Sequence, residues 1–157
     1  MTPSTASADD RLSLTLTRHL RAPPERVYQA WTQVDTLTRW FGPGGEIRML
    51  NAEVDARPGG AYAIRMVDGA GEVHHVRGVY RTLQPFERIE FTWSWISTPE
   101  RESLVTILLK PVGSETHLTL IHDRLFDEAA RDRHEHGWIG CLNGLSAYLA
   151  PVQGDAA

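Results

Sequence analysis

The C-terminal part of the chain follows a different period from everything before it, and this change constrains the fold more than any single motif. From about Asp127 onward, ring-bearing and apolar side chains recur at intervals of three and four residues. They are His134, Trp138, Cys141, Leu142, Leu145, Tyr148 and Leu149. This spacing places them on one face of a helix, so the sequence predicts one long amphipathic helix that begins near Asp127.

The segments before this helix alternate apolar and polar residues, which is typical of half-buried strands. The first strand is predicted near the N-terminus, where Leu12, Leu14 and Leu16 alternate with polar residues. The loop Asp68–Gly71 is predicted to connect two later strands as a hairpin. The strands predicted after the first are Glu46–Asp55, Ala61–Val67, His74–Leu83, Phe86–Trp95, Ser103–Lys110 and Thr116–Asp123.

Two short helices are predicted between the first strand and the second. Pro24 and Glu25 suit the first turn of a helix. The apolar stripe of this helix consists of Val27, Ala30, Trp31 and Val34. Asp35 is expected to cap the second helix. The apolar residues of the second helix are Leu37, Trp40 and Phe41.

This order of elements predicts an α+β domain. It consists of a curved antiparallel sheet of about seven strands wrapped around a long C-terminal helix, with two short helices after the first strand. Alternating βαβ units, and with them a Rossmann-like parallel sheet, do not fit. We expect the domain to span residues 11–150, between a disordered N-terminal tail at 1–10 and a C-terminal tail at 151–157.

The charge and cysteine content exclude several classes of function. The net charge of −4 is spread along the chain without a basic face, so nucleic-acid binding is not predicted. No apolar run reaches the ~20 residues of a membrane span, and the N-terminus lacks the features of a secretory signal. Cys141 is the only cysteine, which fits a reducing, cytoplasmic location. The glycine-rich segments lack the lysine of a phosphate loop, and no cofactor is predicted.

Alternation within each strand identifies the residues that could line an internal pocket. The apolar face of each strand is expected to be the concave one. Aromatic and imidazole groups on apolar walls are the composition of a small-molecule site, while ordinary core packing is the alternative for each residue. The predicted ligand-binding residues are Trp40, Tyr62, Met66, His74, Tyr80, Phe91, Trp93, Trp95, His122, Trp138 and Cys141.

The candidate catalytic residues are His122, His74 and Tyr80. An inward imidazole such as His122 could orient a ligand or act as a general base; a structural histidine is the alternative. Cys141 lies on the apolar stripe of the helix, which is typical of inert packing rather than of a reactive thiolate. No metal site is predicted, because the sequence has no cysteine pair and no His-x-x-x-His spacing.

The predicted terminal helix contains three glycines, Gly137, Gly140 and Gly144. Each costs about 1 kcal/mol relative to alanine inside a helix. Such residues indicate either close packing against a neighbouring backbone or room for a ligand.

Several segments, taken in order, resemble one family. They are Pro24–Trp31, Trp40–Pro43, Asp55–Tyr62, Pro85–Trp93, Thr116–His122 and Gly137–Trp138. Together they look like the domain named for the activator of heat-shock-protein-90 ATPase, in the START and birch-pollen-allergen-like superfamily, also called SRPBCC. The resemblance implies a helix-grip fold with a deep cavity for lipids, polyketides, aromatic molecules or other apolar ligands. The eukaryotic cochaperone of this family has a separate N-terminal chaperone-binding domain, and we do not expect the ten or so polar residues at the start of this sequence to replace it.

Three functions are compatible with these observations. The first is a START-like domain that binds a small apolar or aromatic molecule in an enclosed cavity, reached near Gly42–Gly45. The second is an enzyme of the cyclase, aromatase or hydrolase kind, which needs two acid–base groups to converge on one ligand atom. The third is a protein-interaction module, including stimulation of a chaperone ATPase. The sequence also leaves open whether the chain forms a homodimer.

Overall fold

The computed structural model describes residues 12–42 and 47–150. The predicted tails and most of the Gly42–Gly45 segment lie outside these residues. Within them, the elements are β1 (Leu14–Leu20), α2 (Pro24–Thr32), α3 (Val34–Trp40), β2 (Arg48–Val54), β3 (Ala61–Val67), β4 (Val73–Gln84), β5 (Arg88–Trp95), β6 (Ser103–Val112), β7 (Glu115–Asp123) and α4 (Glu128–Leu149). The predicted order of strands and helices is confirmed.

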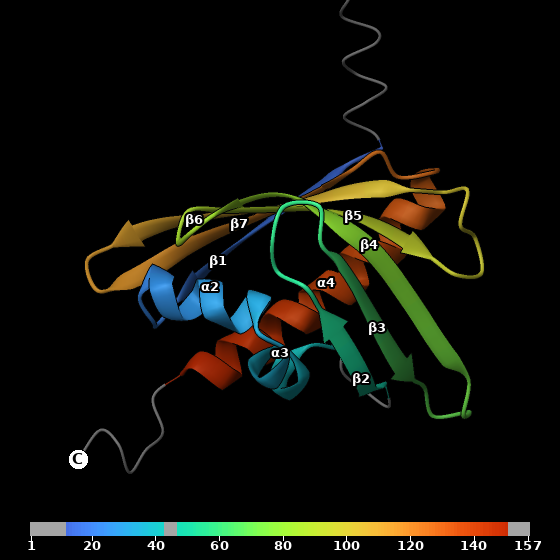
Figure 1. Ribbon diagram of the computed structural model, residues 1–157, viewed down its shortest axis with the longest axis horizontal. Coiled ribbons are helices and arrows are strands. Elements are labelled where there is room, and N and C mark those ends of the chain that lie inside the picture. The colour runs from blue at the N-terminus through green and yellow to red at the C-terminus, as the bar shows by residue number, and fades with distance from the viewer. Residues whose placement is uncertain (1–11, 43–46, 151–157) are drawn as a thin grey trace, which may run out of the picture.

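The strands form one antiparallel sheet in the order β1-β7-β6-β5-β4-β3-β2. Strands β2 to β7 are neighbours in sequence order, and β1 closes the series by pairing with β7, with Leu16 opposite Leu120. The sheet curves over α4, which crosses its concave face, while α2 and α3 lie on the same side (Figure 1). The predicted α+β helix-grip fold is therefore confirmed.

Helix α4 begins where the sequence predicts it. The Asp127 carboxylate accepts a hydrogen bond from the backbone N–H of Ala130 at 2.8 Å, which satisfies one of the free donors at the helix start. Its buried residues are Ala130, Trp138, Cys141, Leu142, Leu145 and Leu149. All of them except Ala130 pack into one core with the inner faces of the strands. The strand residues Val76, Val105, Ile107, Leu118 and Leu120 have no exposed surface there.

The boundary between the two short helices differs from the prediction. Helix α2 ends at Thr32, and Gln33 has an extended backbone that separates it from α3. This break turns Val34 away from the apolar stripe, and its side chain is 38% exposed. The expected cap at Asp35 is wrong, because Asp35 lies inside the first turn of α3 and no side chain caps this helix.

The glycine at position 144 explains how closely α4 approaches α3. A Cβ atom at Gly144 would lie 2.7 Å from the backbone oxygen of Trp40. The backbones of α3 and α4 are therefore in contact here. At Gly144 the helix glycine serves close packing, rather than making room for a ligand. None of the described helices is long and apolar enough to cross a membrane.

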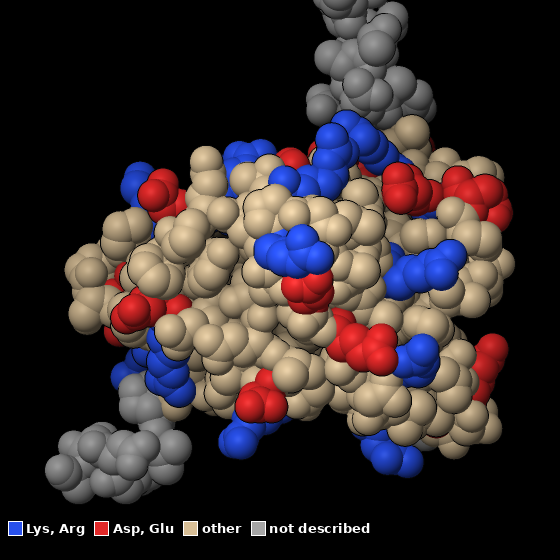
Figure 2. All heavy atoms as spheres, in the orientation of Figure 1, with Lys and Arg blue, Asp and Glu red and all other residues tan. Residues whose placement is uncertain are grey.

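Charged side chains of both signs are scattered over the surface. On the face shown in Figure 2, lysine and arginine side chains lie beside aspartate and glutamate side chains, without a large patch of one sign. This distribution agrees with the charge pattern of the sequence and offers no basic face to phosphates on this side.

Candidate functional site

An opening with mostly apolar walls lies between the first half of α4 and the ends of β3, β4 and β5. We call it the α4 cleft. It has a volume of about 600 Å³ and is partly open to solvent. Its apolar walls are formed by Phe41, Ile47, Met66, Trp93, Trp95 and Trp138. The entrance was predicted near Gly42–Gly45. Residues 43–46 are not among the described residues, so this prediction stays untested.

Two regular elements, β5 and α4, bring most of these side chains to one place. Trp93 and Trp95 are two residues apart on β5 and therefore share a face of the sheet. His134, Trp138 and Cys141 are spaced by four and three residues on α4, so they share a face of the helix. The ring centroids of Trp93 and Trp138 are 5.0 Å apart, which joins the sheet wall to the helix wall.

His134 lies in the cleft as a neutral imidazole held at both nitrogens. The indole N–H of Trp95 donates to His134 Nε2 at 3.0 Å, so Nε2 carries no proton. His134 Nδ1 lies 2.7 Å from the backbone oxygen of Ala130 and therefore donates to it. Burial lowers the pKa of His134 below its ordinary value, and the positive charge of Arg133 lowers it further.

His122 is buried behind the cleft wall and has no exposed surface. The indole N–H of Trp138 donates to His122 Nδ1 at 2.9 Å. The other nitrogen, Nε2, is then the donor to Ser103 Oγ at 2.7 Å. Burial and the nearby His134 hold the pKa of His122 well below its ordinary value. Both ring nitrogens of His122 are hydrogen-bonded to other side chains of the protein. This arrangement is that of a structural histidine, the alternative to a general base.

A second part of the interior, which we call the filled end, contains three further predicted ligand-binding residues. Tyr62, Tyr80 and Phe91 pack together with ring centroids 5.3–6.1 Å apart, and each tyrosine ring meets the Phe91 ring in a T-shaped arrangement. The space beside them is only about 20 Å³, the size of roughly one water molecule. Trp31 from α2 and Leu37 from α3 occupy the rest of this region. These three aromatic residues are core packing in the present structure.

The tyrosine hydroxyl groups of the filled end are not poised for proton transfer. Tyr62 Oη donates to the backbone oxygen of Thr92 at 2.5 Å. Burial, assisted by Tyr80, raises the pKa of Tyr62 well above its ordinary value. Burial likewise raises the pKa of Tyr80, and Tyr28 raises it further.

Trp40 belongs to the packing between helices rather than to the cleft. Its indole N–H donates to the backbone oxygen of Ala30 at 2.9 Å, and its ring packs on Trp31 at 4.8 Å. It also borders a separate surface groove with Gly140 and Gly144.

The predicted site residues therefore divide into groups. Those that line the α4 cleft are Met66, His74, Trp93, Trp95, Trp138 and Cys141. The acid–base candidates do not converge, because His74 lies at the mouth of the cleft, His122 lies behind its wall and Tyr80 lies in the filled end.

Sequence reasoning missed several residues of the cleft. His134 belongs to the predicted helical stripe but is not among the predicted site residues. Its spacing of four residues from Trp138 indicates that the two side chains share a face of the helix. Val73 and Ile96 also line the cleft and are 52% and 40% exposed. Their signal was weaker, because an apolar residue at a strand end is common on any surface.

Two residues that line the cleft, His75 and Trp93, each have a buried polar atom without a partner among the described residues. Trp93 is 4% exposed, and its indole N–H makes no hydrogen bond with any described residue. Trp93 borders both the cleft and the filled end. A buried donor of this kind is costly unless an acceptor satisfies it.

A curved sheet closed over a terminal helix, with an apolar cleft between them, defines the chain as a START-like domain of the SRPBCC superfamily. A family model described as "Activator of Hsp90 ATPase homolog 1-like protein" matches residues 21–150. The chain belongs to this family, as the sequence resemblance indicated. No curated protein matches the chain.

Solved structures of bacterial proteins agree with this assignment. Protein CV1439 from Chromobacterium violaceum is 33% identical, with a TM-score of 0.77 over 89% of this chain and 99% of that one. The AHSA1 protein from Silicibacter pomeroyi is 30% identical, with a TM-score of 0.78 over 87% and 96%. Protein NE0264 from Nitrosomonas europaea is 25% identical, with a TM-score of 0.77 over 90% and 96%.

Proposed function

We propose that this chain binds a small apolar or aromatic molecule in the α4 cleft. The observation that carries this proposal is the cleft itself, whose volume of about 600 Å³ lies within the range of roughly 300–1,000 Å³ that small-molecule sites occupy. Its family, whose fold is that of ligand-binding domains, supports the same interpretation.

The chemistry of the walls favours a planar aromatic ligand. Trp93, Trp95 and Trp138 offer ring faces and edges, and aromatic pairs with centroids about 4.5–7 Å apart gain energy beyond simple burial. The unpartnered indole N–H of Trp93 would favour a ligand with a hydrogen-bond acceptor. The bonded imidazole of His134 adds a polar edge without adding a charge.

Two exposed apolar side chains also lie at the mouth of the cleft, beside its polar residues. Val73 and Ile96 expose about half of their side-chain surface there, and exposed apolar residues around an opening are typical of ligand entry or contact sites. A ligand that covers them would gain the free energy of removing apolar surface from water.

The dye anilinonaphthalene sulfonate, titrated into the purified full-length chain, tests this proposal. We expect saturable binding with increased dye fluorescence. Val73→Asp should weaken the affinity by about tenfold, or about 1.4 kcal/mol, because it replaces an exposed apolar side chain of the mouth with a charged one. Val79→Asp is the matched control, since Val79 is a 41% exposed valine of the same strand that does not line the cleft.

A filling substitution gives an independent test of the same site. Gly137 lines the cleft, so Gly137→Leu should block dye binding while the circular dichroism spectrum stays that of the folded chain. Glu135→Leu, which places the same side chain on the exposed face of α4, should bind the dye normally. Equal affinities for all four variants would refute the proposed site. Native mass spectrometry of gently purified protein would then search for the natural ligand.

A further inference from the structure

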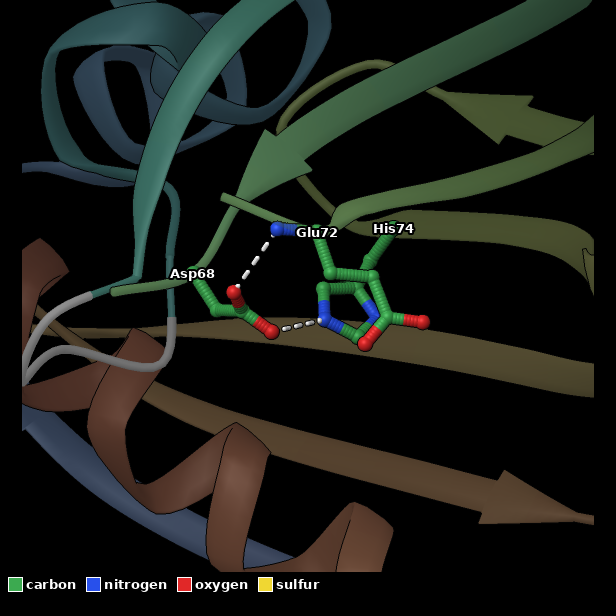
Figure 3. A group of neighbouring side chains, drawn as sticks. All are labelled: Asp68, Glu72 and His74. Atoms are coloured by element: carbon green, nitrogen blue, oxygen red, sulfur yellow. Dashed lines mark hydrogen bonds and ion pairs between the residues drawn. The ribbon is translucent and has the colours of Figure 1, made fainter. Parts of the chain in front are cut away.

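Three side chains capable of binding a metal ion meet at the hairpin between β3 and β4. They are Asp68 at the end of β3, Glu72 in the turn and His74 in β4. One ligand atom from each lies within 4.8 Å of the others. Figure 3 shows the Asp68 carboxylate directed at the His74 ring, with the Glu72 side chain beside that ring.

The hairpin turn fixes the Asp68 carboxylate. Its Oδ1 atom accepts hydrogen bonds from the backbone N–H groups of Ala70 and Glu72, both at 2.9 Å. The backbone N–H of Asp68 donates to the carbonyl of Glu72 at 3.0 Å, which closes the turn. Gly71 adopts a φ of +87°, a conformation that favours glycine. The turn therefore uses one carboxylate oxygen and leaves Oδ2 directed at His74.

We propose that Asp68, Glu72 and His74 bind a divalent transition-metal ion at the mouth of the α4 cleft. Asp68 Oδ2 and His74 Nε2 are 2.9 Å apart. Two neighbouring ligands of a tetrahedral zinc ion, each about 2.1 Å from the metal, are separated by about 3.4 Å. The hydrogen bond therefore already holds the two atoms close to the required separation, and a side-chain shift of about 0.5 Å would let them share an ion. Glu72 is exposed, so its carboxylate can adjust to supply the third ligand.

The donor set selects the class of ion. An imidazole with two carboxylates suits zinc and its first-row neighbours, whereas calcium and magnesium prefer oxygen ligands alone. The site is accessible, because the side chains of His74 and Asp68 are 38% and 24% exposed. Glu72 and His74 also line the cleft, so an ion held here would border the space proposed for the apolar ligand. The proposal does not depend on that ligand.

The sequence did not predict this group of ligands. Cysteine pairs and two histidines one helical turn apart are recognisable metal-binding patterns, whereas these three ligands are brought together by the turn of a β-hairpin. The hydrogen bond from His74, together with the turn N–H groups, lowers the pKa of Asp68. Its carboxylate is therefore ionised at neutral pH, as a metal ligand must be.

Isothermal titration of the chelator-treated full-length chain with zinc chloride tests the proposal. We expect one equivalent of zinc to bind. His74→Ala should weaken binding by at least the roughly 10–100-fold that even the loss of an outer-shell partner costs. Asp68→Asn should have a similar effect, and it retains the Oδ1 acceptor of the turn, so the hairpin is expected to persist. Circular dichroism checks the fold of both variants.

The control for adventitious binding is His19→Ala. His19 forms a surface pair with Glu115, which is an imidazole–carboxylate pair outside the proposed three-residue group. This variant should bind zinc like the unmodified chain. The proposal is wrong if no saturable binding occurs. It is equally wrong if folded His74→Ala and Asp68→Asn proteins keep full affinity, or if His19→Ala alone removes it.

Discussion

The filled end and the α4 cleft lie between the same sheet and the same set of helices, yet one is packed and the other is open. At the filled end, Trp31 and Leu37 from α2 and α3 are pressed against the tyrosine and phenylalanine rings, and about 20 Å³ is left. Beyond Trp31 and Leu37, the cleft lies between the first half of α4 and strands β4 and β5, with Phe41 and Ile47 also in its wall, and about 600 Å³ remains. The short helices therefore decide where the fold is hollow.

The largest expected effect compares one aromatic residue from each region. Phe91 is 6% exposed in the filled end, so Phe91→Ala should lower the free energy of unfolding by about 3–5 kcal/mol. Trp95→Ala in the cleft should lower it by clearly less, because the ring of Trp95 is only partly buried. Urea unfolding of both variants measures the difference. Equal losses would show that the two regions are packed alike.

The pH dependence of stability tests the neutral histidines at the cleft wall. Burial lowers the folded-state pKa of His122 and His134, so the unfolded chain binds protons more readily. The contribution of each histidine to the free energy of unfolding is therefore fully present above its pKa in the unfolded chain, about 6.5. It is lost as the pH drops below that value, by at most about 1.4 kcal/mol per pH unit for each histidine. Urea unfolding between pH 7.5 and about 5 should show this loss, and His134→Gln should reduce its slope. A flat profile would contradict the burial of neutral imidazoles.

The close contact between the α3 and α4 backbones at Gly144 predicts that replacing this helix glycine with alanine lowers the stability of the protein instead of raising it. Gly144→Ala should destabilise the protein by about 1 kcal/mol. The added Cβ would meet the Trp40 backbone oxygen at 2.7 Å, and overpacking costs about 1–3 kcal/mol, which exceeds the helix-propensity gain of alanine. The exposed Ala147→Gly is the comparison, and it should lose about 1 kcal/mol from propensity alone. A stabilised Gly144→Ala protein would mean that α3 and α4 are not in contact.

The smallest effect concerns Cys141, whose thiol lies at the cleft wall but is 3% exposed. Burial raises the pKa of this thiol to about 12, so thiolate is scarce at pH 8. A disulfide exchange reagent should therefore react slowly with the folded protein and quickly after unfolding in urea. Rapid reaction of the folded protein would show that the wall opens around this residue.

The sequence was sufficient to predict the fold and the inward faces of the strands, because both follow from periodicity. Alternation placed Trp93 and His122 inward, and helical spacing placed Trp138 and Cys141 on the face of α4 that meets the sheet. Periodicity says nothing about what lies opposite an inward residue. The partners of His122, Ser103 and Trp138, come from other elements, so its occupied nitrogens became visible only in three dimensions.

The division into an open and a filled region was equally beyond the sequence. It depends on how far α2 and α3 extend across the sheet, and the break at Gln33 sets the course of α3. Tyr62 and Trp95 both point inward, but only the position of these helices places the first in packed core and the second in the cleft.

The central claim, that the cleft rather than the filled end receives an apolar ligand, can be tested with the indole N–H signals of the five tryptophans. Two-dimensional ¹H–¹⁵N NMR spectra, recorded as anilinonaphthalene sulfonate is added, report on each of them. The signals of Trp93, Trp95 and Trp138 should shift with one binding constant, while those of Trp31 and Trp40 should stay in place. Unchanged signals at all five, or shifts confined to Trp31 and Trp40, would contradict the account.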